Sequence, residues 1–380
     1  MAAVAALLIG FSLLWPATAG GWVAPRLMLL GAAGLLLITN RVKTGGQICW
    51  PHPIVRVAGG VLVLLSTAAV VFAADPAGVA WGVTPRWSGV ASLSVTMAVG
   101  WWVGAQLSRA GALDVFTTVP VAVVVVQAVY AVGETLRFVG LGLPRPIGMM
   151  GSATDLGLLG AATAVWFLAR LKAHDGTPAW LLWVGVVAAV VLVGLSGSRA
   201  AGVGFLIGLV VWASATRSWR LVVLLIPLVV VATIPQLWRW TGGDAVAAGS
   251  ATSRLELWSQ AWPLTGHTVW GAGGAFATTF IPSGALDGER FDDPHNLLLL
   301  VGLWGGVPLI VAVTVCAVAG SMWLVKTHQW AVIAVLAACA PTVLSSPLSL
   351  PLAGVLAALV AVSVASRHGS LRQGEYPVSR

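Results

Sequence analysis

Charged residues are scarce in this chain, and their scarcity excludes most classes of protein. Only 8% of the 380 residues are Asp, Glu, Lys or Arg, whereas 58% are hydrophobic and the mean hydropathy is +0.95. Soluble domains carry about 25% charged residues. A soluble fold of this length cannot bury so much apolar surface, so the composition predicts a polytopic membrane protein.

Cysteine is also scarce, with three residues in the whole chain. Cys49 falls in a predicted cytoplasmic loop, and Cys316 and Cys339 fall inside apolar segments. We therefore expect no disulfide and no metal site. The net charge is +8, but the sequence lacks the basic clusters and aromatic–basic interleaving typical of nucleic-acid binding, so no nucleic-acid partner is predicted.

Apolar runs of spanning length recur along the chain. They lie at about 3–19, 22–39, 57–74, 88–107, 115–133, 152–169, 179–196, 200–214, 221–236, 296–324, 329–346 and 350–366. Since about 20 residues cross a bilayer, the predicted fold class is all-α, with about 12 transmembrane helices. Gly302, Gly305, Gly306 and Pro308 predict that the long tenth span is broken or strongly tilted.

The basic residues predict an orientation. With the N-terminus inside, twelve of the 20 Lys and Arg residues fall in inner segments, together with only three acids. By the positive-inside rule both termini are cytoplasmic. The predicted domains are one transmembrane domain at 1–366 and a short cytoplasmic tail at 367–380. A large external loop at 237–293, between spans 9 and 10, contains a short amphipathic helix.

A pattern inside this external loop predicts the start of that helix. The run 253–256 reads Ser-Arg-Leu-Glu, which matches a capping box with Ser253 as N-cap. Arg254 then occupies the first helical position, where unpaired N–H groups and the helix dipole favour anions. The apolar stripe expected to lie on the membrane or against the bundle is Leu255, Trp258 and Trp262, and Pro263 ends the helix.

Two further helix starts are predicted on the outer side. Asp293 is expected to cap span ten, with Pro294 at its first position and His295 next. The helix dipole disfavours a charged imidazole there and Asp292 and Asp293 favour it, so the protonation state of His295 is left open. Ser198 is expected to cap span eight and to put Arg199 in its first turn.

These helix starts together place two guanidiniums, an imidazole and three positive dipole ends on one face. That set of groups suits a phosphate ester or a pyrophosphate. Each residue alone has a structural explanation, because an arginine at a helix end is usually a topology or headgroup anchor. Asp155, near the outer start of span six, fits a helix cap and a site residue equally well.

The joint pattern resembles the O-antigen ligase and O-antigen polymerase family of bacterial envelope glycosyltransferases. The resemblance covers about residues 130–325 and rests on four motifs. These are Arg145-Pro146-Ile147-Gly148, Gly197-Ser198-Arg199-Ala200, Ser253-Arg254 with Leu257-Trp258 and the stretch from Pro263 to Gly273, and Pro294-His295-Asn296 followed by Gly302 and Gly305.

The resemblance implies an inverting transfer of glycan from a polyprenyl-diphosphate carrier to an acceptor hydroxyl on the outer face of the cytoplasmic membrane. Arg199 and Arg254 would bind the diphosphate, and His295 would orient or deprotonate the acceptor, which is a glycan, a lipid or a protein. The other substrate-binding candidates are Asn296, Arg145 and Asp293, with Asp292 and Asp293 as alternative bases. The resemblance also implies that no metal or other cofactor is needed. The absence of a Walker motif, a metal-ligand cluster and an Asp-x-Asp motif is consistent with a lipid-linked donor.

Three functions remain as alternatives at this point. The first is the glycosyltransferase, as a polymerase or a ligase, which the sequence does not separate. The second is a multispan transporter or flippase for envelope lipids or glycans, which would need charged residues deep inside its spans. The third is a scaffold for envelope assembly, which would tolerate alanine at Arg254 and His295.

Overall fold

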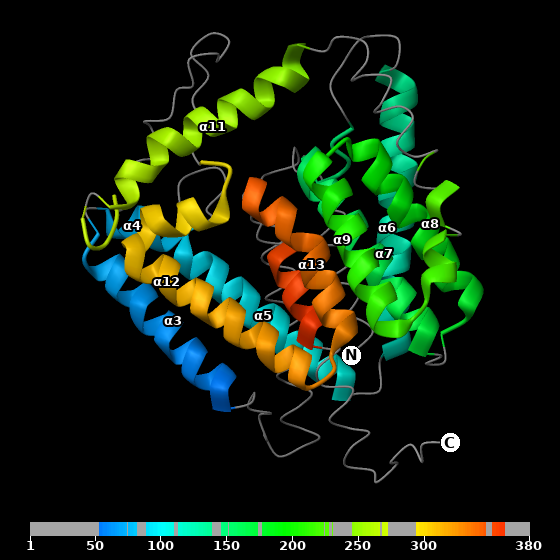
Figure 1. The fold of residues 1–380 in the computed structure, drawn as a ribbon, viewed down its shortest axis with the longest axis horizontal. Helices are drawn as coiled ribbons and strands as arrows, with labels where there is room; N and C mark the ends of the chain where they lie inside the picture. The colour runs from blue at the N-terminus through cyan, green and yellow to red at the C-terminus, as the bar shows by residue number, and fades with distance from the viewer. Residues whose placement is uncertain are drawn as a thin grey trace.

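The protein is described from a computed structural model in which every described regular element is an α-helix. The described residues are 53–73, 75–81, 89–109, 113–138, 146–150, 152–173, 177–223, 225–227, 230, 245–266, 268–272, 294–346 and 352–361. The helices are α3 (Pro53–Val71), α4 (Pro76–Trp81), α5 (Val90–Arg109), α6 (Leu113–Phe138), α7 (Ala153–Ala173), α8 (Ala179–Ser196), α9 (Arg199–Thr216), α11 (Ala245–Thr265), α12 (Leu297–Lys326) and α13 (Trp330–Ser345) (Figure 1). A further helix covers Leu352–Ala361.

Five of these helices are long and apolar enough to cross a membrane, and they make the chain an integral membrane protein. They are Thr117–Arg137 within α6, and α7, α8, α9 and α12. Each coincides with a predicted span, and α8 matches its predicted bounds at both ends. The predicted spans at 3–19 and 22–39, and most of 221–236, lie outside the described residues. The total of about 12 spans therefore stays a prediction.

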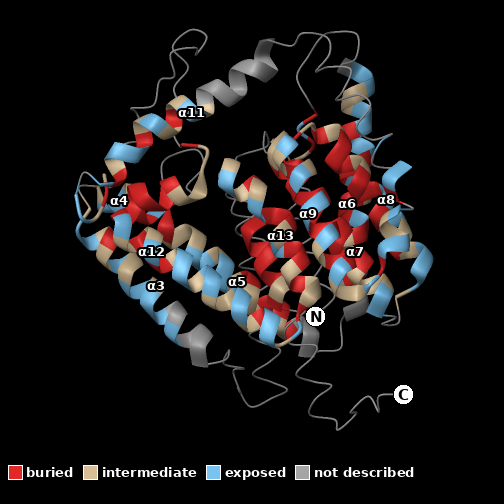
Figure 2. Ribbon diagram, in the orientation of Figure 1, coloured by how far each residue is buried: buried red, intermediate tan, exposed pale blue. Residues whose placement is uncertain are grey.

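The larger of two buried regions is centred on α7, which is buried along most of its length (Figure 2). Helices α8, α9 and α13 pack around it through glycines. A Cβ added at Gly204 of α9 would fall on the carbonyl oxygen of Ala338 in α13, and one at Gly160 of α7 would lie 2.6 Å from that of Ala189 in α8. Small residues let helix backbones approach closely, which is a main source of helix association in lipid.

These glycine contacts also show in which direction the helices run. Gly157 of α7 meets the end of α8, whereas Gly160 meets residues earlier in α8, so α7 and α8 are antiparallel. Gly204 and Gly208 of α9 meet Ala338 and then Ala334 of α13, so this pair is antiparallel too. Only three residues join α12 to α13. Helices α7, α9 and α12 therefore all begin at the same end of the bundle.

The smaller buried region joins α3, α11 and the first half of α12. Figure 1 shows α11 lying across the end of the bundle at which α12 begins, and this end is called the α11 end below. Buried apolar side chains of this region include Ala69, Leu257, Ala261, Leu300 and Leu303.

The predicted break in span ten is confirmed inside α12. Gly305 and Gly306 have non-helical backbone angles, and Gly306 has φ 66° and ψ −165°, a conformation open to glycine alone. The turn at 268–272 packs into this break, since a Cβ on Gly306 would fall on the carbonyl oxygen of Val269. Gly271 approaches α12 in the same way and has φ 76°. Protein backbone therefore covers the part of α12 where the helix is interrupted.

Candidate functional site

The start of α9 has the predicted cap. Ser198 is the N-cap, and its side-chain oxygen accepts a hydrogen bond from the backbone N–H of Ala201 at 3.3 Å. Gly197 before it has φ 60° and closes α8 in the left-handed conformation that glycine adopts without strain. Arg199 is the first residue of α9 and is exposed. An arginine therefore stands at the first position of a helix, where the N–H groups and the helix dipole favour anions.

The start of α12 differs from the prediction. The N-cap is Asn296, whose side-chain oxygen accepts from the N–H groups of Leu298 at 2.9 Å and Leu299 at 3.1 Å. Asp293 as N-cap and Pro294 as first helical residue were wrong, because the helix begins only at Leu297. Asparagine is as good a cap as aspartate, and this one closes the first turn with two bonds.

His295 consequently lies just before the helix rather than inside it. Its φ is 50°, in the left-handed region that few non-glycine residues occupy, although histidine is enriched among them. Pro294 before it is buried, and His295 itself is half-buried. Backbone strain of this kind concentrates at functional sites, because the surrounding structure must hold it. The imidazole thus has a fixed point of attachment near the mouth of α12.

The capping box at 253–256 is the second correction. Helix α11 begins at Ala245, so Ser253 lies inside it and Arg254 is not at a helix start. The preceding residues 245–249 are three alanines, a valine and a glycine, and alanine is the strongest helix former, so the helix extends back past the box. The expected dipole contribution at Arg254 is therefore absent, and what remains for anion binding is its half-buried guanidinium.

The buried face of α11 also differs from the predicted stripe. Leu257 and Ala261 are buried, Trp258 packs partly against the same cluster, and Leu255 and Trp262 are exposed. The helix continues to Thr265, two residues past Pro263. The sequence predicted that this helix lies on the membrane or against the bundle. In the structure α11 packs against α12.

The structure brings the three helices that carry the candidate residues to the α11 end. Arg254 lies one turn before Trp258, and His295 lies one turn before Leu299, and both apolar residues belong to the smaller buried region. Arg199 begins α9 at this same end but stands on the larger buried region. The site is thus divided between the α7–α9 bundle and the unit of α11 and α12.

The alternatives for Asp155 are resolved in part. The hydroxyl of Ser152 accepts from the backbone N–H of Asp155 at 3.3 Å, so Ser152 rather than Asp155 caps α7. Asp155 lies in the first turn of α7 at the α11 end and is buried. A carboxylate at a helix N-terminus is stabilised by the dipole, which accounts for part of its placement.

Three candidate residues, Arg145, Asp292 and Asp293, lie outside the described residues. Within the described residues no group of three or more His, Cys, Asp or Glu side chains is arranged to hold a metal ion. Cys339 is buried and Cys316 half-buried, and both lie in apolar helices as predicted.

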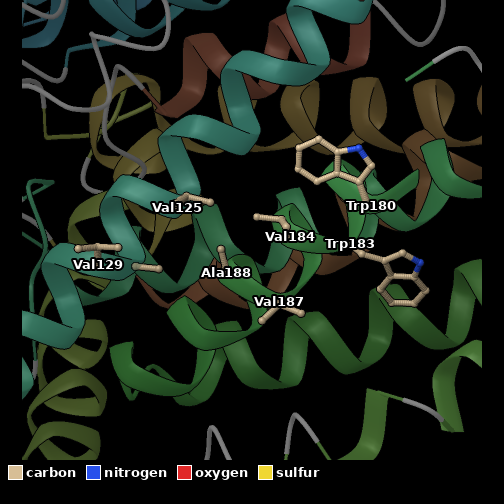
Figure 3. Close-up of a pocket in the computed structure, with 8 residues that line it drawn as sticks. Val125, Val129, Trp180, Trp183, Val184, Val187 and Ala188 are labelled. Carbon is tan, nitrogen blue, oxygen red and sulfur yellow. The ribbon is translucent and has the colours of Figure 1, made fainter. Parts of the chain in front are cut away.

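One groove in the described part of the chain lies elsewhere, between α6 and α8, and has a volume of about 590 Å³ (Figure 3). Its lining is Val125, Ala128, Val129, Trp180, Trp183, Val184, Val187 and Ala188. A diphosphate needs charged donors, and this lining of valines, alanines and two tryptophans has none, so the groove is not the anion site. Its chemistry suits hydrocarbon, as expected for a helix face in lipid.

The described fold is that of an all-helical integral membrane protein, in which the helices that carry or follow Arg199, Arg254 and His295 lie at the α11 end. Residues 184–314, about a third of the chain, match the O-antigen ligase family, so the protein carries an O-antigen ligase family domain. This segment runs from the middle of α8 to the middle of α12 and includes Arg199, Arg254 and His295. No curated protein and no solved structure matches the chain.

Proposed function

We propose that this protein is a metal-independent inverting glycosyltransferase. It moves glycan from a polyprenyl-diphosphate carrier to an acceptor hydroxyl on the outer face of the cytoplasmic membrane, as a surface polysaccharide polymerase or an O-antigen-type ligase. The observation that carries the proposal is that the O-antigen ligase segment at 184–314 contains Arg199, Arg254 and His295. Helices α9 and α12 begin at the end of the bundle across which α11 lies.

The proposed step is a single displacement. The acceptor oxygen attacks the anomeric carbon of the donor sugar, and the bond from that carbon to the diphosphate oxygen breaks on the opposite side. His295 takes the proton of the acceptor hydroxyl, or orients that hydroxyl for attack. The electron pair of the broken bond leaves with the diphosphate, whose growing charge Arg199 and Arg254 stabilise.

The two arginines contribute differently in this step. Arg199 stands at the start of α9, where the helix dipole and the N–H groups of the first turn favour anions. Arg254 lies within α11 and acts through its guanidinium alone, which can bind two phosphate oxygens at once. Lysine cannot replace that planar fork of donors.

Asn296 has a narrower role than the sequence indicated. Its side-chain oxygen is occupied by the N–H groups of Leu298 and Leu299, so only its NH2 group is left to contact a sugar or His295. We propose Arg145 and Asp293 as further substrate-binding residues, with Asp292 or Asp293 as alternative bases. The acceptor is a glycan, a lipid or a protein.

The distribution of charge supports a transferase over a transporter. Among the described spans, α8 has no charged residue, and α9 has only Arg199 at its start. The charged residues of α7 lie in its first and last turns. A transport path needs ionisable groups near the middle of the membrane. We propose the positive-inside orientation for this bundle, with both termini cytoplasmic and the α11 end outside.

The first test is the profile of carrier lipids in cells that lack the protein, complemented with wild type or with His295→Ala at equal expression. We expect wild type to clear the accumulated polyprenyl-diphosphate glycans and the variant to leave them. Full complementation by His295→Ala would show that the imidazole takes no part in the reaction, and trapping of the lipid on the inner leaflet would favour a flippase.

The same profile separates the two branches of the proposal. A missing polymerase leaves carrier lipids with a single repeat unit, because the units are never joined. A missing ligase leaves long chains on the carrier, because these are never passed to the final acceptor. The length of the accumulated glycan therefore identifies the acceptor class.

A further inference from the structure

We propose that Ser196, which lies against Gly157 of α7, is a positioning residue that fixes the backbone position of Arg199. The inference rests on the proposed role of Arg199 in diphosphate binding. Ser196 was not among the residues that the sequence singled out, and its own side chain is completely buried. It therefore acts through Arg199 and does not touch substrate.

Ser196 uses its hydroxyl on both sides of the turn between α8 and α9. Its Oγ donates to the carbonyl oxygen of Val193 at 2.9 Å and accepts from the backbone N–H of Ser198 at 3.2 Å. The first bond anchors the side chain to the last turn of α8, and the second holds the residue that caps α9. One hydroxyl thus connects the two helices at the residue before Arg199.

The rest of the turn is fixed at each residue. The N–H of Gly197 donates to the carbonyl oxygen of Gly194 at 3.3 Å, and the N–H of Gly202 donates to that of Ser198 at 2.9 Å. Ser198 is nearly buried, and its own hydroxyl accepts from Ala201. The path from Ser196 to the first turn of α9 therefore leaves little freedom to the backbone of Arg199.

Gly157 supplies the surface on which this turn rests. A Cβ at Gly157 would lie 2.5 Å from Ser196 Oγ and 2.8 Å from the Cβ of Ala201. The first turns of α7 and α9 and the last turn of α8 are thus in van der Waals contact, with no room for one more methyl group. Because α7 is the most buried of the five candidate spans, the turn rests on the closely packed centre of the larger buried region.

The side chain of Arg199 is exposed, so the buried frame fixes only the point from which it extends. A binding group that is displaced by about 1 Å can lose about 10²-fold in rate. Loss of the Ser196 hydroxyl is therefore expected to weaken diphosphate binding through Arg199 without removing any donor to the substrate. A residue with a purely structural role would instead lower stability and leave the Arg199 contribution unchanged.

The test is a double-mutant cycle with Ser196→Ala and Arg199→Ala in the full chain in nanodiscs, with undecaprenyl diphosphate as the probe and undecaprenyl monophosphate as the control. We expect Ser196→Ala to weaken diphosphate binding by about 10-fold in the wild-type background and by less than about 2-fold in the Arg199→Ala background. Its effect on the melting temperature should be the same in both. Equal losses of affinity in the two backgrounds, or no loss in either, would overturn the inference.

The cycle also separates this inference from the proposed function. If Arg199→Ala alone binds undecaprenyl diphosphate as tightly as wild type, the arginine is no diphosphate ligand, and the proposed function fails at that residue. If Arg199→Ala weakens binding but Ser196→Ala does not, the function stands and the positioning role is refuted.

A compensating pair covers the case in which a single variant folds poorly. Gly157→Ala adds a methyl group against Ser196 Oγ, and Ser196→Ala removes that oxygen. We expect Gly157→Ala to weaken diphosphate binding more than the pair Gly157→Ala with Ser196→Ala. A pair that binds no better than Gly157→Ala alone would show that the contact between these residues does not set the position of Arg199.

Discussion

The starts of α9 and α12 were both predicted to be capped helix starts that carry a candidate site residue, and the two are held in different ways. Arg199 is the first residue of α9. The start of this helix packs against α7 through Gly157 and the turn at 196–198. His295 precedes its helix, and the first segment of α12 is held by α11 and by the turn at 268–272. The arginine thus stands on a closely packed bundle, and the histidine stands on a short segment that ends at a break.

This difference corresponds to two tasks in the proposed reaction. Leaving-group stabilisation needs donors that are in place before charge develops, which a rigid frame provides. The acceptor side must accept a bulky glycan, lipid or protein, which suits a separate unit over the α11 end. The glycine break after Trp304 divides α12 between these tasks, because its second half packs with the bundle through α13.

The largest expected effect is the loss of activity in His295→Ala, which removes the imidazole and leaves the start of α9 untouched. Loss of a general base costs about 10²–10⁴-fold in rate. Transfer from a lipid-linked donor by the protein in nanodiscs measures it. Binding of undecaprenyl diphosphate should stay within about 2-fold of wild type, because that task belongs to the arginines. A large loss of diphosphate affinity would show that the two helix starts do not divide the work in this way.

His295→Gly sharpens the same comparison, because it separates backbone strain from chemistry. Histidine at φ 50° bears the cost of the left-handed conformation, which is about 1–2 kcal/mol for a residue with a Cβ. We expect His295→Gly to be as inactive as His295→Ala but more stable by about 1 kcal/mol. Thermal unfolding in detergent compares the two. Equal stability would mean that the left-handed conformation is not maintained in solution.

Gly306→Ala is expected to break the unit that holds the start of α12. The new Cβ would meet the carbonyl oxygen of Val269, in a backbone conformation that only glycine adopts. The expected cost is about 3 kcal/mol or more in stability, from strain and displacement of the turn. Gly320→Ala is the matched control, because it lies in the same helix with nothing within 4 Å of the added methyl group. It should be neutral or slightly stabilising.

The outcome for activity tests the division of α12 directly. If Gly306→Ala still folds, its rate of transfer should fall while its affinity for undecaprenyl diphosphate through Arg199 remains. If Gly306→Ala and Gly320→Ala unfold at the same temperature, the packing of the turn at 268–272 into α12 contributes nothing to stability.

Much of the fold was predictable because composition and run length determine it. The bounds of α8 follow from an uninterrupted apolar run between Pro178 and Gly197. Pro178 precedes the helix as its N-cap, and Gly197 ends it in the left-handed conformation that glycine adopts without strain. The break in α12 was predictable from adjacent glycines followed by Pro308. The N-caps of the helices were less predictable than the helix bounds. Ser198 was right, whereas the patterns at Ser253 and Asp293 were wrong, because neighbouring residues favoured other helix starts.

The contacts that position the site could not be predicted from sequence. Gly157 and Ser196 are 39 positions apart, and nothing in either neighbourhood indicates that one rests on the other. The contact between Val269 and Gly306 could not be predicted either, because it joins two backbones and no side-chain pattern in the sequence indicates it. Local signals predicted which residues carry the chemistry, whereas the contacts that hold these residues are seen only in the tertiary packing.

Arg254→Lys has a smaller expected effect than loss of the histidine. It tests whether a positive charge that lies inside a helix, away from a helix start, is sufficient for diphosphate binding. Lysine keeps the charge but loses the bidentate donors, so we expect about 10–100-fold weaker binding of undecaprenyl diphosphate. Arg199→Lys should lose less, because the N–H groups at the start of α9 remain. The ratio of the two affinities is the measurement. A larger loss in Arg199→Lys would mean that the helix start adds little to anion binding.

The smallest expected effect compares the two caps themselves. Asn296→Ala removes hydrogen bonds to two backbone N–H groups, at 2.9 and 3.1 Å, and Ser198→Ala removes one, at 3.3 Å. A cap is worth about 1 kcal/mol, so Asn296→Ala should cost about 1–2 kcal/mol and Ser198→Ala about 0.5–1 kcal/mol. Asn296→Asp is the control, since aspartate caps equally well. Ser196 also holds the backbone N–H of Ser198, which gives the start of α9 a second support when the Ser198 hydroxyl is removed. A greater loss of stability in Ser198→Ala than in Asn296→Ala would contradict this order.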